Sequence, residues 1–175
     1  MYLDLITDKI TIQALSVVIT FLYLVAFILS AKNWRSSPSV FLLSCILFVN
    51  FFIANNSLYG LLFEERDIPT EVYYLNWLRD DVISIIATIL SHLILRVKVQ
   101  KITVFALWVL VINTVMYATM HIDIVVLNNR TEPWWLWGIY SVVVNTVEFI
   151  VAVLIIAFQL LTNNTKNKQR SDYGI

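Results

Sequence analysis

The chain has 175 residues, a formal net charge of zero and a single cysteine, Cys45. Hydrophobic residues make up 59% of it and charged residues 14%, whereas soluble domains carry about 25% charged residues. This composition gives no sign of a nucleic-acid partner, and one cysteine excludes both an intrachain disulfide and a cysteine-based metal cluster.

Five apolar segments are long enough to cross a bilayer, which takes roughly 20 helical residues. In chain order they cover about residues 9–31, 39–63, 71–95, 102–122 and 133–161. All three prolines stand at helix starts, where a missing N–H breaks no hydrogen bond. We therefore predict an all-α polytopic membrane protein. It would have a five-transmembrane-helix bundle over residues 1–165 and a short basic cytoplasmic tail over residues 166–175.

The first two spans, residues 9–31 and 39–63, hold their few polar side chains mostly in the outer half of the membrane. The second span carries Asn55 in this half. Lipid offers no hydrogen-bond partner, so such an amide must face another helix, water or a ligand. We expect Asn55 either to line a polar cavity or to bond a neighbouring helix.

The third span, residues 71–95, contains the charged triplet Arg79-Asp80-Asp81. A rise of about 1.5 Å per residue places Asp81 roughly 8 Å below the outer surface of a hydrocarbon core about 30 Å thick. The triplet is expected either to form the outer entrance of a polar vestibule or simply to end the helix in the interface. Polar residues of this helix share one stripe at helical spacing: Asp81, Ser84, Thr88, Ser91 and His92. His92 is expected to form either an interhelical hydrogen bond or part of a proton relay.

The fourth and fifth spans, residues 102–122 and 133–161, add Asn113, Asn145 and Glu148. Glu148 lies about 18 Å below the tryptophan belt that opens the fifth span, near the middle of the membrane. A carboxylate there costs roughly 3 kcal/mol or more, which favours a role in binding a proton, an ion or a ligand over a role in joining helices.

The distribution of charge predicts the orientation. With the N-terminus outside and the C-terminus in the cytoplasm, most basic residues fall on the inner side: Lys32, Arg35, Arg96, Lys98, Lys101, Lys166, Lys168 and Arg170. The positive-inside rule favours this topology, and it indicates a plasma membrane or a bacterial inner membrane.

Several chemistries find no support in the sequence. No lysine lies deep in a span, and no metalloprotease motif or phosphate-binding glycine loop is present, so we expect neither a cofactor nor an enzyme. The sequence also offers candidate ligands for a hard or borderline cation: Asp80, Asp81, His121 and Glu148.

The leading hypothesis is a polar, outward-facing intramembrane cavity that binds, senses or conducts a proton or small cation. Glu148 would be its central group, Asp80 and Asp81 its entrance, and Arg79 a residue that tunes them. The alternative is a non-catalytic interaction protein that packs its helices against a partner. It would be a homo-oligomer, a subunit of a larger membrane complex, or a protein of the immunity or exclusion type.

Overall fold

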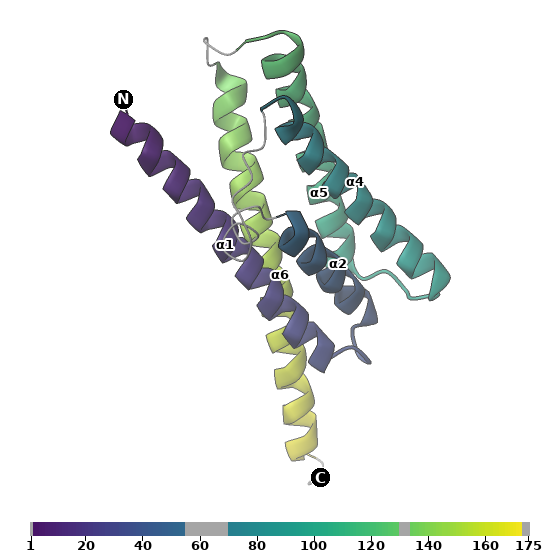
Figure 1. Cartoon of the computed structure of the whole chain (residues 1–175). Coiled ribbons are helices and arrows are strands. Elements are labelled where there is room, and N and C mark those ends of the chain that lie inside the picture. The colour runs from purple at the N-terminus through teal and green to yellow at the C-terminus, as the bar shows by residue number, and fades with distance from the viewer. Residues whose placement is uncertain (1, 55–69, 130–133, 173–175) are drawn as a thin grey trace.

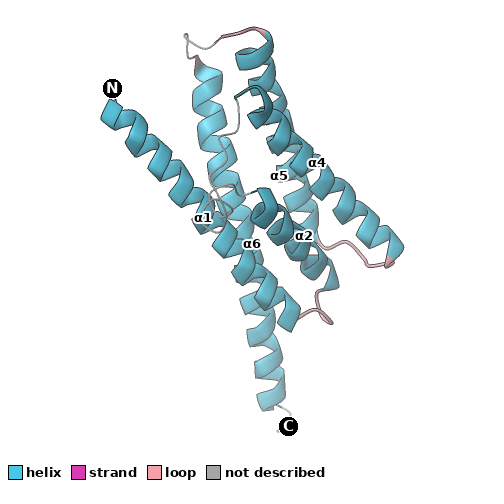
Figure 2. Cartoon of the chain, viewed as in Figure 1, coloured by secondary structure: helices cyan, strands magenta, loops and turns pink. Residues whose placement is uncertain are grey.

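The computed structural model describes residues 2–54, 70–129 and 134–172, and every regular element within these ranges is a helix (Figure 1, Figure 2). The predicted all-α class is therefore confirmed for the described residues. The elements are α1 (Tyr2–Lys32), α2 (Pro38–Ala54), α4 (Thr70–Ile94), α5 (Lys101–His121), the π-helix η1 (Ile122–Val126) and α6 (Trp135–Asp172).

The α-helices form a closed ring. Along the ring, α1 packs against α2, α2 against α4, α4 against α5, and α5 against α6, which returns to α1. Consecutive helices run in opposite directions, and the C-terminal part of α6 extends past the other helices (Figure 1). Because the ring closes, each helix turns one face toward a common interior.

Local sequence explains the sharp reversal between α1 and α2. After α1 ends at Lys32, the backbone carbonyl of Asn33 accepts the N–H groups of Ser36 and Ser37, at 2.9 and 3.0 Å. Pro38 then opens α2, at a position where its missing N–H would have no helical partner.

The end of α4 has the hydrogen bonds of a Schellman motif. The N–H of Val97 bonds to the carbonyl of His92 at 3.0 Å, and the N–H of Arg96 bonds to the carbonyl of Leu93 at 3.4 Å. Arg96 occupies the left-handed position of this motif, with φ at 52°, where glycine is usual because it has no Cβ. Two backbone hydrogen bonds therefore cap the C-terminal end of α4, and Arg96 adopts a strained backbone conformation there.

Two helices of the described residues are long and apolar enough to cross a membrane, over Lys101–Val126 and Trp135–Thr165. The apolar helices of the first two predicted spans are shorter in the described residues, Val17–Lys32 and Pro38–Ile53. The rest of the second predicted span, from residue 55 onward, lies outside the described residues. The third predicted span lies in α4, which carries three adjacent charges, Arg79, Asp80 and Asp81. Helix α4 is not among the described helices that are long and apolar enough to cross a membrane.

Helix α6 continues past the predicted end of the fifth span at residue 161. It runs to Asp172 and includes residues that we expected to form a separate tail. The sequence between Leu161 and Asp172 contains neither glycine nor proline, so nothing in it stops the helix.

Many large apolar side chains lie on the surface of the described residues, and many polar side chains are buried. Large apolar side chains cover the outside, with Ile94 75% exposed and Trp108 64% exposed. The interior combines an apolar cluster around Leu43, Leu110 and Ile155 with many buried polar groups. An exposed apolar surface of this extent needs an apolar environment or a partner to cover it.

Candidate functional site

The centre of the ring contains the side chain of Glu148, which is 5% exposed. The hydroxyl of Tyr23 on α1 donates a hydrogen bond to Oε2 of Glu148 at 2.7 Å. The side-chain amide of Asn113 on α5 donates to Oε1. Each carboxylate oxygen therefore has a neutral donor from a different helix, an arrangement that favours a negatively charged acceptor.

A second carboxylate, Asp81 on α4, faces the same interior. It is 3% exposed and lies within electrostatic range of Glu148. Its Oδ2 atom has no hydrogen-bond partner among the described residues. Two acidic side chains are thus buried within electrostatic range of one another, and one of them has an oxygen without a hydrogen-bond partner among the described residues.

No basic side chain of the described residues neutralises this pair. Arg79, two positions before Asp81, instead bonds to Oδ1 of Asp80 through both Nε and Nη2, each at 2.8 Å. Among the residues whose burial the structure describes, His92 is the one buried basic residue, and both of its ring nitrogens have other partners. Two like charges in a low-dielectric interior repel strongly, so a proton or a cation is needed to neutralise one of them.

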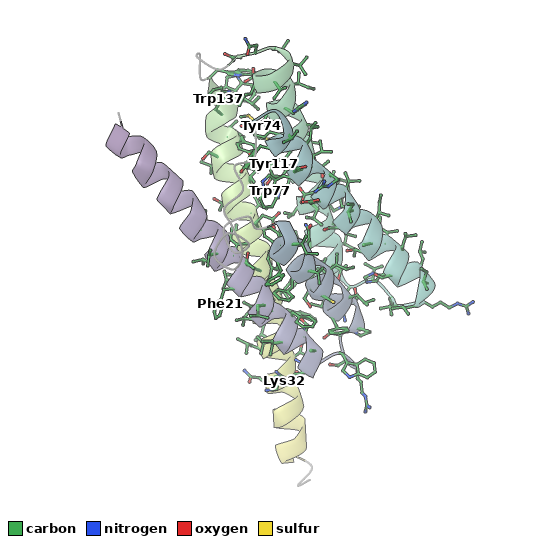
Figure 3. The ribbon with its side chains drawn as sticks, in the orientation of Figure 1. Phe21, Lys32, Tyr74, Trp77, Tyr117 and Trp137 are labelled. Carbon is green, nitrogen blue, oxygen red and sulfur yellow. The ribbon has the colours of Figure 1, made fainter. Side chains whose placement is uncertain are left out.

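Aromatic side chains surround the carboxylates. The ring of Tyr23 lies 4.8 Å from that of Phe51, and Trp77 stacks on Tyr117 at 6.2 Å. Tyr117 also meets Tyr140 edge to face at 5.8 Å. Figure 3 shows Trp77 and Tyr117 gathered between α4, α5 and α6. These ring contacts accompany the low exposure of Asp81 and Glu148.

The predicted stripe on α4 is mostly buried. Ser84 and Thr88 follow Asp81 at helical spacing, and both are almost fully buried. Their hydroxyl oxygens have no hydrogen-bond partner in the described part of the chain, and neither has Oδ1 of Asn113. Ser91 differs, because its hydroxyl bonds back to the carbonyl of Thr88 at 2.9 Å. The stripe on α4 that starts at Asp81 therefore presents several buried oxygen atoms that have no hydrogen-bond partner among the described residues.

His92, in the last turn of α4, connects three helices through hydrogen bonds. Its Nδ1 lies 2.7 Å from the carbonyl oxygen of Thr88, which only accepts, so Nδ1 carries a proton. In the neutral ring Nε2 then accepts the hydroxyl of Ser39 at 2.8 Å. The hydroxyl of Thr103 and the N–H of Gln100 donate to the same Ser39 oxygen, at 2.8 and 3.1 Å. The interhelical hydrogen bond, one of the two roles expected for His92, is therefore present.

The structure separates the charged triplet. Asp81 faces the interior, whereas Arg79 and Asp80 line a cavity of about 400 Å³ between α2 and α4. A helix turns by about 100° per residue, so adjacent side chains point in different directions. The three charges do not form one entrance.

The other predicted residues fall in several places. Asn55 lies outside the described residues, and Asn145 is on α6, three positions before Glu148, with a side chain that is also outside them. His121 is half-buried at the end of α5. No three His, Cys, Asp or Glu side chains gather within the described ranges, so the candidate metal ligands do not form one site there: Asp80, Asp81, His121 and Glu148.

Tyr23 was not singled out as a site residue from the sequence, although it bonds directly to Glu148. The available signal was a tyrosine in the middle of an apolar helix, because a buried hydroxyl usually needs a partner. A second unexpected cluster joins α6 to the turn after α1. Asn33 donates to Oε1 of Gln159 at 3.0 Å, and Gln159 donates to the Ser37 hydroxyl at 3.1 Å.

The short helix η1, directly after α5, holds a further acidic group that the sequence did not mark. Asp123, in η1, is buried and accepts the indole N–H groups of Trp134 and Trp137 at 3.0 and 2.7 Å. Asn129 donates to its other oxygen at 3.1 Å. Asp123 has donors for both oxygens, and its hydrogen bonds join η1 to the start of α6.

No protein family, curated protein or solved structure matches this chain, so its function is argued from the geometry of the site.

Proposed function

We propose that the protein is a five-span membrane bundle, with its N-terminus outside, that binds a proton or small cation at the carboxylate pair Asp81–Glu148. The observation that carries this proposal is the burial of two interacting carboxylates without a basic partner among the described residues. Charge balance in a low-dielectric interior then requires a positively charged ligand.

The exposed apolar surface and the polar interior support the membrane placement. Two helices meet the length and composition of a span, and the ring places α1, α2 and α4 alongside them. In the five-span arrangement, the apolar outer faces of these helices meet lipid, and their charged side chains face the interior or the interface.

The donors to Glu148 support an ionised carboxylate at that position, since Tyr23 and Asn113 both present hydrogens to it. Asp81 offers Oδ2 and Asn113 offers Oδ1 as acceptor atoms without partners in the described residues. Oxygen atoms of this kind are the ligands that hard cations prefer, and the same Asp81 oxygen is able to hold a proton.

A thermal unfolding series on the purified protein in detergent tests the proposal. A ligand that binds only the folded state raises Tm with its concentration. We expect Tm to rise either with added Li⁺, Na⁺ or K⁺ chloride at fixed pH, compared with N-methylglucamine chloride, or with proton concentration at fixed salt. Asp81→Asn and Glu148→Gln should each abolish that dependence.

Two variants serve as controls. Ser91→Ala and Thr114→Val remove hydroxyls that bond only to backbone carbonyls of their own helices, and they should keep the wild-type response. A wild-type Tm that ignores both pH and alkali cations would overturn the proposal. Ion flux into liposomes that contain the protein then separates conduction from binding alone, because a sensor binds without flux.

A further inference from the structure

The cavity between α2 and α4 is a second candidate site, separate from the carboxylate pair. Its volume of about 400 Å³ falls within the roughly 300–1,000 Å³ typical of small-molecule sites. Neither Asp81 nor Glu148 belongs to its lining. Any occupant of this cavity is therefore distinct from a ligand held between Asp81 and Glu148.

Most of the cavity wall is apolar. Ile46, Val49 and Ile53 come from α2, and Ile83 and Ala87 come from α4. Val49, Ile53 and Ile83 are also among the exposed side chains on the outside of the bundle, so the cavity adjoins the surface that we assign to lipid. An extended hydrocarbon chain matches such a wall.

Polar groups occupy the remainder of the lining. The amide nitrogen of Asn50 and the hydroxyl of Ser84 are buried and have no hydrogen-bond partner among the residues that the structure describes. Both are able to donate hydrogen bonds, so they call for an acceptor such as an ester carbonyl. Ser84 is almost fully buried, and its position in the lining places this unmet donor at the cavity.

The charged part of the lining is the ion pair Arg79–Asp80, joined at 2.8 Å. The Arg79 side chain is 61% exposed, so its guanidinium remains accessible to a further anion. The pair as a whole has no net charge. A headgroup that carries both a phosphate and an ammonium offers an opposite charge to each member, whereas a purely anionic headgroup would place its charge beside Asp80.

We propose that this cavity binds one molecule of a phospholipid with a primary-amine headgroup, of the phosphatidylethanolamine class. The phosphate meets Arg79, the ammonium meets Asp80, and an ester carbonyl accepts from Asn50 or Ser84. One acyl chain lies along the apolar wall. The inference rests on the membrane placement in the proposed function, but it does not depend on the carboxylate pair.

Native mass spectrometry of the delipidated protein tests this assignment. The protein is mixed in detergent with phosphatidylethanolamine, phosphatidylcholine or phosphatidylglycerol of identical acyl chains. We expect one retained phosphatidylethanolamine per chain and about tenfold weaker retention of the other two, because choline has no N–H to donate and glycerol has no positive charge. Equal retention of all three lipids would overturn the proposal, as would preference for phosphatidylglycerol.

Variants locate the adduct. Arg79→Gln and Asp80→Asn should each reduce retention of phosphatidylethanolamine about tenfold, and Ala87→Leu should reduce it by filling the cavity. Arg35→Gln, another exposed arginine, and Ile94→Phe, an enlargement on the outer surface of α4, are the matched controls and should retain the lipid. An adduct that survives both Ala87→Leu and Arg79→Gln would place the lipid elsewhere.

Cys45 provides a test that needs no substitution. It is the single cysteine of the chain and lines the cavity. Alkylation of Cys45 with a bulky maleimide should remove the lipid adduct while the circular dichroism spectrum stays unchanged. An alkylated, folded protein that keeps the adduct would contradict the proposal. Asp81→Asn and Glu148→Gln should keep the lipid, so failure of this proposal and failure of the cation proposal give different results.

Discussion

Tyr23 and Glu148 lie 125 positions apart in the chain, and the hydroxyl of Tyr23 donates to Oε2 of Glu148 at 2.7 Å. The same hydroxyl lies 3.3 Å from the backbone carbonyl of Glu148. This contact joins α1 to α6, the two helices that close the ring. The hydrogen bond therefore contributes both to the ring and to the position of its central carboxylate.

Tyr23→Phe should destabilise the protein by about 1–3 kcal/mol, because it leaves a buried carboxylate oxygen without a donor. The phenylalanine ring keeps the contact with Phe51, so packing is preserved. Chemical unfolding in detergent measures the change. Tyr140→Phe is the control, since its hydroxyl forms no hydrogen bond with Glu148. In combination with Glu148→Gln, the two effects should be non-additive by about 0.5 kcal/mol or more. Strict additivity would show that the hydrogen bond does not contribute.

Asn113→Asp should destabilise the bundle at neutral pH by about 3 kcal/mol or more, because it replaces a donor to Glu148 with a third buried carboxylate. Acidification should recover part of this loss, since protonation removes the repulsion between carboxylates. The measurement is Tm as a function of pH. Thr114→Val, at the next position, should leave the pH dependence of the wild type unchanged. A variant as stable as wild type at neutral pH would argue against the close contact between Asn113 and Glu148.

Asp123→Asn should loosen the connection between η1 and α6 and destabilise the protein by about 1–3 kcal/mol. In the wild type, the Asp123 carboxylate accepts three hydrogen bonds, from Asn129, Trp134 and Trp137. The asparagine side chain has an NH₂ group in place of one carboxylate oxygen, so it faces at least one of these donors with another donor. Near-ultraviolet circular dichroism should lose tryptophan signal, because Trp134 and Trp137 lose their fixed partner. Asn129→Ala removes a single donor and should have the smaller effect. If the two variants are equally stable, the indole hydrogen bonds contribute little.

Arg96→Gly should stabilise the protein by about 0.5–1 kcal/mol, because φ at 52° strains a residue with a Cβ but not glycine. Arg35→Gly is the control for loss of an exposed arginine side chain. Arg35 has no positive φ, so glycine there should be neutral or destabilising. Thermal unfolding of both variants makes the comparison. A destabilised Arg96→Gly would mean that the arginine side chain has contacts that outweigh its backbone strain.

The sequence by itself was sufficient for the helical class and for much of the helix placement. The end of α4 at Ile94 and the start of α5 at Lys101 lie within one residue of the predicted bounds. Hydrophobic runs and proline positions are local signals, and they specify helices without reference to the rest of the chain. Helical spacing also anticipated that Ser84, Thr88 and His92 follow Asp81 on one stripe, and these side chains are buried.

The tertiary structure decided which polar groups meet. It paired Tyr23 and Asn113 with Glu148, and it separated Asp81 from Arg79 and Asp80 although the three are adjacent in the chain. Helical periodicity gives the face of a residue but not the helix that this face will meet. That choice depends on how the described helices close into a ring. Contacts between residues more than a hundred positions apart arise only when the whole ring packs.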